Sequence, residues 1–366
     1  MKILHIGKLN QDKANGIRTV LPNHVAEQAK YEEILFQNVL PYILEDIPYQ
    51  VLFNKRGWPF NIKDKAGNSF IPNLVVFHGV YHFEMIKLSK VLIRKKIPYI
   101  IVPHGSLTKQ AQSIKRLKKI LGNVVFFNRF LKKACAIQFL SQTEYDNSKV
   151  KNNKFIGTNG CIIPSKQKQL FNTDKIKFVY IGRLDWFHKG LDILLDAFKL
   201  LKDSPYKDKC ELCIYGPDYQ GRYAHVKQMI VERSLSGLVT LNPAVFGADK
   251  EKILLGSDVF IQTSRFEGMP MGILEALGYG LPCLITEGTT LGHYVKSYNA
   301  GWVTETDAQR VFEQIICAIN ENDTLNEKSK NARDMIHQHF AWEKVAKDNI
   351  NAYRELLNQE KNNVFV

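Results

Sequence analysis

The sequence predicts an α/β protein with two domains, each built around a doubly wound parallel sheet. Its length of 366 residues suits two domains better than one. Short apolar runs rich in β-branched residues alternate with helical stretches along the whole chain, and this alternation is typical of parallel sheets. A polar, lysine-rich stretch at residues 165–177 separates two such series. We therefore expect a first domain at residues 1–170 and a second at residues 171–340.

The expected strands fall into two sets of four. The first set comprises residues 3–6, 74–78, 99–104 and 136–140, and the second comprises residues 178–182, 212–216, 259–262 and 283–286. Apolar residues at positions 191, 194, 195 and 198 repeat with helical spacing, which predicts a helix after the first strand of the second set.

The six cysteines do not indicate a disulfide framework or a zinc site. Only Cys210 and Cys213 are closely spaced, and residues three apart on a strand point to opposite faces of a sheet. Buried, reduced thiols are the better interpretation. No segment approaches the roughly 18 apolar residues needed to cross a bilayer, and the first residues read as a strand rather than a signal peptide. The sequence therefore predicts a cytosolic protein.

Positive charge is concentrated in the first half of the chain. Residues 1–170 hold 27 Lys and Arg against 10 Asp and Glu, whereas residues 171–366 hold 23 against 26. Thirteen of the basic residues lie between Glu84 and Glu144, where the sequence has no acidic residue. This segment is expected to contact a negatively charged partner, or at least to tolerate one.

A basic amphipathic helix is expected within this segment, at residues 114–125. Its apolar residues recur near helical spacing, and its basic residues take the other side: Lys115, Arg116, Lys118 and Lys119. An anionic membrane surface and nucleic acid phosphates are the candidate partners, and a solvated helix face is the alternative. The segment has few aromatic residues placed to stack on bases, so we expect no nucleic acid partner.

The most informative motif is Ser-Arg-Phe-Glu-Gly-Met-Pro-Met-Gly-Ile-Leu-Glu at residues 264–275. Pro270 suits the first turn of a helix, so the amides around Gly268, Met269 and Met271 are expected at a positive helix end that can receive phosphate. Glu267 precedes this end and Glu275 lies about a turn and a half inside the helix. Two carboxylates so placed can bind hydroxyl groups at separate points of one elongated ligand. Helix capping and solvent exposure are the structural alternative.

A second motif follows the strand expected at residues 178–182. The strand ends at Gly182, Arg183 follows it, and Lys189 precedes the helix. Arg supplies a planar fork of donors and Lys a compact charge, a suitable pair for a diphosphate whose negative charge grows as it leaves. Simple solvation of both side chains is the alternative.

These two motifs resemble those of the retaining, nucleotide-sugar-dependent glycosyltransferases of the GT-B fold, in the large family 4-like group marked by E-x7-E. Glu267 and Glu275 match that motif. Gly182-Arg-Leu-Asp-Trp-Phe-His-Lys-Gly matches the diphosphate-binding segment with one additional residue between Arg183 and Lys189. Asn15-Gly-Ile-Arg resembles the amino-terminal glycine loop, with Asn15 where the first glycine is usual, and Val102-Pro-His-Gly-Ser resembles the segment whose histidine contacts the donor sugar.

The resemblance implies two Rossmann-like domains facing across a cleft, with a closing helix at residues 341–366 that packs back on the first domain. Arg183 and Lys189 would stabilise the leaving diphosphate, Glu267 and the amides after it would contact the donor sugar, and Glu275 would bind the ribose. His104 would bind the transferred sugar, and the backbone at Gly16 would approach the donor phosphates. His78 and His82 are weaker candidates for acceptor contacts, and a structural role for each is favoured.

The resemblance also implies that no metal or other cofactor is required, because Arg and Lys neutralise the diphosphate and no D-x-D motif is present. UDP-sugars are favoured over GDP-sugars as donors. The uneven charge suggests a lipid-linked glycan acceptor, placing the protein on the inner face of the plasma membrane in bacterial surface polysaccharide or glycolipid synthesis. The alternatives are a sugar-nucleotide epimerase on the same scaffold and, less favoured, a nucleic-acid-binding protein.

Overall fold

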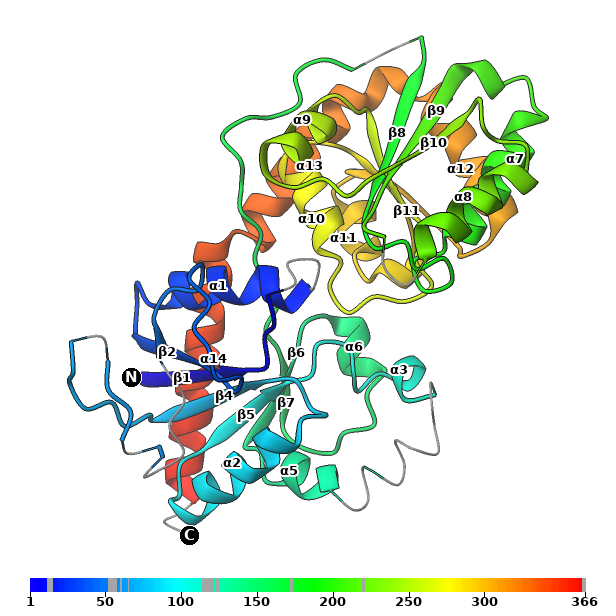
Figure 1. The fold of residues 1–366 in the computed structure, drawn as a ribbon. Coiled ribbons are helices and arrows are strands. Elements are labelled where there is room, and N and C mark those ends of the chain that lie inside the picture. The colour runs from blue at the N-terminus through cyan, green and yellow to red at the C-terminus, as the bar shows by residue number, and fades with distance from the viewer. Residues whose placement is uncertain are drawn as a thin grey trace. The chain divides into compact units, whose positions relative to one another are not determined.

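The computed structural model divides the chain into two compact units (Figure 1). Unit 1 comprises Met1–Gly160 and Trp342–Val366, and unit 2 comprises Cys161–Ala341. The residues that the structure describes are 1–11, 16–51, 58–59, 61–64, 66–113, 122, 126–171, 174–218 and 221–363. Both units are parallel-sheet α/β structures, which confirms the predicted fold class.

The described part of unit 1 forms a seven-stranded parallel sheet in the order β3-β2-β1-β4-β5-β6-β7. These strands are β1 (Lys2–Gly7), β2 (Glu33–Asn38), β3 (Gln50–Val51), β4 (Leu74–His78), β5 (Tyr99–Val102), β6 (Ala136–Phe139) and β7 (Lys154–Ile156). Strand order reverses between β1 and β4, where His5 lies opposite Val76 and Gly7 opposite His78. In open α/β sheets ligands bind beyond the carboxyl ends of strands at such a switch point.

Helices and the central strands of unit 1 share an apolar core. The helices are α1 (Gly16–Gln28), α2 (Phe83–Arg94), α3 (Lys109–Ser113), α5 (Asn128–Lys132), α6 (Gln142–Asp146) and α14 (Trp342–Asn363). Every residue of β4 and β5 is buried, as expected of parallel strands covered on both faces. Tyr99 and Phe130 stack at the centre of this core, with ring centroids 5.6 Å apart.

The last helix, α14, belongs to unit 1, where it packs beside α1. Its Tyr353 is fully buried and donates a hydrogen bond to Gln138 Oε1 of β6 at 2.8 Å. Arg354 pairs with Glu32 at 2.6 Å, and the Trp342 ring lies 5.8 Å from that of His24. The chain therefore completes the first unit with residues that follow the second in sequence.

Unit 2 contains a six-stranded parallel sheet, in the order β10-β9-β8-β11-β12-β13 among the residues described. These strands are β8 (Ile176–Ile181), β9 (Cys210–Tyr215), β10 (Val239–Asn242), β11 (Val259–Gln262), β12 (Cys283–Thr286) and β13 (Gly301–Thr304). The strand order reverses between β8 and β11, so the loops that follow these two strands meet at the switch point of this sheet.

The helices of unit 2 carry apolar residues at helical spacing, so that one face of each helix can cover the sheet. They are α7 (Leu191–Lys202), α8 (Arg222–Glu232), α9 (Gly247–Leu255), α10 (Met271–Gly278), α11 (Gly292–Ser297), α12 (Ala308–Asn320) and α13 (Leu325–His339). The predicted helix after residue 190 is confirmed as α7, whose apolar positions 191, 194, 195 and 198 are all buried. Asp192 in its first turn and Lys202 in its last complement the helix dipole.

The first change of unit lies at Gly160 and Cys161, earlier than the expected position near residue 170. The lysine-rich stretch that suggested a linker is in part buried in unit 2. Lys168 is 8% exposed and its Nζ lies 3.2 Å from Asp258, which is fully buried. Composition cannot distinguish a lysine that is buried with a charged partner from a lysine in an exposed linker, because the surrounding sequence is equally polar.

Several expectations about single segments can be compared with the structure. Cys210 and Cys213 are buried free thiols on β9, as interpreted from the sequence. Within the described ranges, no helix is both long and apolar enough to span a membrane. The basic helix expected at residues 114–125, with Lys115, Arg116, Lys118 and Lys119, lies almost wholly outside the described residues.

Candidate donor site

The two loops at the switch point of unit 2, which follow β8 and β11, carry seven of the predicted site residues. Gly182 ends the β8 region, and its amide donates to Tyr215 O at 3.0 Å. Arg183 follows and is exposed, and among the described residues its guanidinium makes no ion pair. The turn then bends back through Asp185, whose side chain accepts from the amide of His188 at 3.1 Å. This turn brings Lys189 to the start of α7.

Gly190 allows the loop before α7 to pack against the strand-end loop of β11. Its φ of +65° lies in the left-handed region, and an added Cβ would lie 1.9 Å from the carbonyl oxygen of Thr263. Thr263 Oγ1 donates back to Gly190 O at 2.7 Å. Because Lys189 and Ser264 are the neighbours of these two residues, this close backbone contact brings the two site loops together.

Lys189 and Glu267 form a half-buried ion pair at this junction. Lys189 Nζ lies 2.5 Å from Glu267 Oε1, and the two side chains are 13% and 9% exposed. The same carboxylate oxygen accepts from Ser264 Oγ at 2.8 Å and from Gln262 Nε2 at 3.1 Å. Burial opposes ionisation of Glu267, but the charge of Lys189 and these hydrogen bonds lower the pKa of the carboxyl overall.

Helix α10 begins directly after this carboxylate. Pro270 is the residue before the helix rather than part of its first turn, and the Pro270 carbonyl accepts from the amide of Ile273 at 3.1 Å. Gly268 contacts the neighbouring loop through its carbonyl, which accepts from Thr290 Oγ1 at 3.2 Å. Met269 and Met271 are half-buried. The predicted phosphate-binding segment therefore lies at the amino end of α10, beside Glu267.

Glu275 lies on α10 and is paired with Lys250 of α9. The glutamate and lysine side chains are 32% and 25% exposed, so the pair remains accessible to a ligand. The sequence singled out Glu275 but not Lys250, because the two residues lie on different helices and no local pattern connects them. In this unit each of the two glutamates of the E-x7-E motif thus forms an ion pair with a lysine.

In unit 1, His104 lies in the turn that follows β5. Its φ of 48° is in the left-handed region, where His is more common than most residues with a side chain. The turn is closed by Ser106, whose amide and hydroxyl both donate to Pro103 O. His104 Nε2 lies 3.1 Å from His78 Nδ1, so two histidines that the sequence considered separately are hydrogen-bonded partners.

This histidine pair continues into the core. His78 Nε2 lies 2.9 Å from His5 Nδ1, and His5 Nε2 lies 2.9 Å from Gln28 Oε1. Burial lowers the pKa of His5 and of His104 to about 4, and burial also places the pKa of His78 well below its usual value. All three imidazoles are therefore neutral at physiological pH. His78 is buried and hydrogen-bonded at both ring nitrogens, which fits the structural role favoured for it, whereas His82 is half-buried at the start of α2.

Glu144 is a buried carboxyl that the sequence did not single out. It is 1% exposed, and its Oε2 accepts from the amide of Leu140 at 2.8 Å. Burial raises its pKa to about 7, although hydrogen bonds from the backbone of Leu140 and Gly105 lower it in part. Gly105 belongs to the His104 turn, so this carboxyl lies against it. The capping-box pattern of Ser141 and Glu144 could have located the residue, but not its burial.

Two other predicted features have limited structural counterparts. Gly16 is the first residue of α1 and is exposed, whereas Asn15 and the rest of the expected glycine loop lie outside the described residues. In the described ranges no group of three or more His, Cys, Asp or Glu side chains is placed to hold a metal ion.

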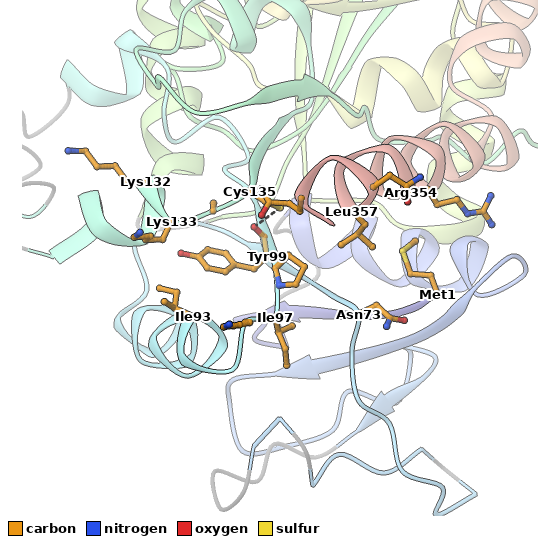
Figure 2. A pocket seen from close by; sticks show the side chains of 15 residues that line it. Met1, Asn73, Ile93, Ile97, Tyr99, Lys132, Lys133, Cys135, Arg354 and Leu357 are labelled. Atoms are coloured by element: carbon orange, nitrogen blue, oxygen red, sulfur yellow. Dashed lines mark hydrogen bonds between the residues drawn. The ribbon is translucent and has the colours of Figure 1, made fainter. Parts of the chain in front are cut away.

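An open pocket of about 1060 Å³ lies where the strands of the unit 1 sheet begin, at the opposite end of these strands from the histidines (Figure 2). It is lined by Asn73, Tyr99 and Cys135, which precede or begin β4, β5 and β6, and by Leu357 of α14. Since His78 ends β4 and His104 follows β5, both lie at the carboxyl ends of these strands, and this pocket is separate from the histidine chain.

Comparisons with known proteins agree with this geometry. Residues 163–335 match the family described as "Glycosyl transferases group 1". The UDP-Gal:alpha-D-GlcNAc-diphosphoundecaprenol alpha-1,3-galactosyltransferase of Escherichia coli is 36% identical over 92 residues, which are 25% of this chain and 24% of that protein. The O-antigen chain mannosyltransferase B of Escherichia coli is 27% identical over 181 residues, 49% of this chain and 45% of that protein. The chain spans less than half the length of these curated relatives.

Two solved structures have the same fold over nearly the whole chain. Sucrose-phosphate synthase from Thermosynechococcus elongatus is 15% identical with a TM-score of 0.71, covering 98% of this chain and 99% of its own. HepE of Anabaena, in complex with UDP, is 17% identical with a TM-score of 0.72, covering 97% and 100%. The protein thus has a GT-B fold. Residues 163–335, which lie in its second unit, match the group 1 glycosyl transferases, in agreement with the family resemblance of the sequence motifs.

Proposed function

We propose that this protein is a retaining glycosyltransferase that moves a sugar from a nucleotide diphosphate sugar to a lipid-linked glycan acceptor. A UDP-sugar is the favoured donor, and the product is a bacterial surface polysaccharide or glycolipid. The observation that carries the proposal is the Lys189–Glu267 ion pair, at the switch point of a group 1 glycosyltransferase domain and beside the amino end of α10.

The charges of the site suit a departing diphosphate. Without ligand, Glu267 neutralises Lys189, and the exposed Arg183 lies earlier in the same loop. A diphosphate that gains negative charge as the glycosidic bond breaks interacts more strongly with both cations in the transition state than in the ground state. Glu267 would then be released from Lys189 to accept hydrogen bonds from the sugar. These cations make a divalent metal unnecessary in this proposal.

The nucleoside would be bound on the far side of the diphosphate. Glu275 can accept hydrogen bonds from both ribose hydroxyls, and Lys250 holds its carboxylate in place. For the retained configuration we propose a same-face displacement, in which the leaving phosphate helps to deprotonate the acceptor. The galactosyltransferase relative is named for a UDP-sugar donor and a diphosphoundecaprenol-linked acceptor, which supports these substrate classes for this chain.

Donor chemistry can be tested without the acceptor. The purified protein is incubated with a panel of UDP- and GDP-sugars. Slow release of nucleoside diphosphate together with free sugar is the expected result, because water replaces the missing acceptor. An isomerised sugar nucleotide would instead identify an epimerase, and no reaction and no binding with any donor would contradict the proposal.

We also propose that unit 1 binds the inner face of the plasma membrane. Residues 115–119 lie outside the described residues, and the neighbouring described surface carries exposed aromatic and basic side chains. Phe83 of α2 and Phe126 before α5 are 55% and 47% exposed, with ring centroids 5.3 Å apart. Exposed Lys87, Lys90 and Arg129 lie on the same two helices. Exposed aromatic rings surrounded by cations suit an anionic bilayer surface, where each cation contributes about 1 kcal/mol.

Liposome binding tests this surface. The triple variant Lys87→Gln, Lys90→Gln and Arg129→Gln should bind vesicles containing anionic lipid more weakly than the unmodified protein, and the difference should shrink as salt is added. The matched control removes three exposed lysines from unit 2: Lys199, Lys227 and Lys330. An equal loss of vesicle binding in both variants would show that net charge alone determines binding. Unchanged binding of the first variant would contradict the assignment of this surface.

A further inference from the structure

The open pocket at the amino ends of the unit 1 strands combines an apolar lining with exposed cations. Its apolar residues include Ile93 and Ile97 at the end of α2, Tyr99 of β5 and Leu357 of α14. Its volume of about 1060 Å³ lies at the upper end of the range of small-molecule sites in proteins. Neither the histidine chain nor the donor loops of unit 2 contribute to its lining, so the proposed transferase reaction does not account for it.

Four of the lining side chains are cations and one is an acid, Glu360. Arg354 is already ion-paired, whereas Lys96, Lys132 and Lys133 are exposed and form no ion pair with any described residue. Helices α2 and α5 both end beside this pocket, and the negative ends of their dipoles account for part of its basic character. The remaining positive charge suits an anionic group on a ligand.

Lys96 occupies a backbone position that favours glycine. Its φ of 55° lies in the left-handed region. Its amide donates to Ile93 O at 3.2 Å and the amide of Ile97 donates to Leu92 O at 3.0 Å, the pattern with which many helices end at a glycine. A side chain in this conformation is less stable than glycine. The chain thus places a lysine at the edge of the pocket although glycine would stabilise the fold, which points to a role for its charge.

The pocket adjoins the surface for which membrane binding is proposed. A smaller cavity of about 220 Å³ lies between α2 and α5 and is lined by Lys90, Phe126 and Arg129 of that surface. Ile93 lines both this cavity and the large pocket. An apolar chain that leaves the bilayer at this surface would therefore find a further apolar lining beside it.

We propose that the pocket binds one anionic lipid of the membrane. An acyl chain would lie along Ile93, Ile97 and Leu357, and the lipid phosphate would be held by Lys96 and Lys133. Burial of the chain removes apolar surface from water, and each cation adds an attraction that only an anionic head group gains. The choice of a membrane lipid rests on the membrane binding proposed above, whereas the pocket itself requires only an anionic amphiphile.

Binding is measured by calorimetry with dodecyl phosphate, below the concentration at which it forms micelles. Dodecylphosphocholine has the same chain but no net charge, and inorganic phosphate has no chain. Dodecyl phosphate should bind at least about 10-fold more tightly than either of them. A thiol reagent locates the ligand, because half-buried Cys135 lines the pocket and half-buried Cys317 belongs to unit 2. Dodecyl phosphate should slow modification of Cys135 and leave that of Cys317 unchanged.

The cations are tested by a pair of double variants. Lys96→Gly with Lys133→Gln should weaken dodecyl phosphate binding by about 3- to 30-fold. The melting temperature should not fall, since glycine suits the conformation of residue 96. The matched control is Arg94→Gln with Lys95→Gln, which removes two exposed cations that precede Lys96 and do not line the pocket. The control should bind dodecyl phosphate like the unmodified protein.

Three results would overturn the proposal: equal binding of dodecyl phosphate and dodecylphosphocholine, binding without protection of Cys135, or equal weakening in the two double variants. If the unmodified protein does not bind anionic vesicles, the membrane source of the lipid is wrong, whereas calorimetry judges the pocket by itself. Failure of every nucleotide sugar to react would contradict the proposed transferase activity and would leave both of these measurements unaffected.

Discussion

Replacing Glu144 with Gln should make unit 1 more stable, and increasingly so as the pH rises. The Glu144 carboxyl is buried and has a pKa of about 7 in the folded protein, against an ordinary value of 4.5. The folded state therefore holds its proton more tightly than the unfolded state, and stability falls as the pH rises from about 4.5 to about 7. A difference of about 2.5 pKa units corresponds to about 3 kcal/mol at high pH. Gln keeps an acceptor for the amide of Leu140 and cannot ionise.

The free energy of unfolding of both proteins is measured by urea unfolding at several pH values. Hydrogen exchange of peptides covering residues 136–146 then reports the stability of this segment. The stability advantage of Glu144→Gln should grow by about 2.5 kcal/mol between about pH 5 and about pH 8. Glu33→Gln, which removes a carboxylate that is 64% exposed, serves as the control and should show no such growth. A pH-independent difference for Glu144→Gln, or one that shrinks as the pH rises, would refute the reasoning.

Three further outcomes follow from the site in unit 2. Gly190→Ala should lower both the melting temperature and the turnover of the protein. A side chain in the left-handed conformation of residue 190 costs about 1–2 kcal/mol, and the added Cβ would also meet Thr263 O. An unchanged melting temperature would exclude this contact. Arg183→Ala should reduce turnover by about 10² to 10³, with a smaller effect on donor binding, and wild-type rates would remove Arg183 from the mechanism. Activity should persist in excess chelator, and its loss on chelation with recovery on adding a divalent metal would require a metal in the reaction.

The central strands and the donor loops could be predicted because their signals are local. Residues 74–78 and 259–262 are continuous apolar runs, and these strands are buried on both faces. The edge strands β3, β7, β10 and β13 were not predicted, since short or half-exposed strands lack such runs. Strand β2, which is buried from Ile34 onward, was also missed. The loops that carry Arg183, Lys189 and Glu267 follow β8 and β11, and parallel topology brings the ends of those strands to one edge. The roles of these residues stay predictions.

The partners of these residues could not be predicted, because they come from distant parts of the chain. Lys250 holds Glu275 from another helix, and His5 of β1 is hydrogen-bonded to Gln28 of α1 and His78 of β4. His5 looked like an ordinary strand residue. Lys168 was assigned to a linker because composition alone does not show that Asp258 is buried beside it.

The central claim is that the Lys189 charge stabilises the diphosphate as it leaves a donor bound in unit 2. The most direct measurement compares turnover of a reactive UDP-sugar by the unmodified protein and by Lys189→Ala, with circular dichroism to show that both are folded. The control is Lys175→Ala, a surface lysine of the same unit paired with Glu211. The account predicts that Lys189→Ala lowers kcat by about 10² to 10³ while Lys175→Ala leaves it unchanged. A folded Lys189→Ala protein with the kcat of the unmodified protein would contradict it.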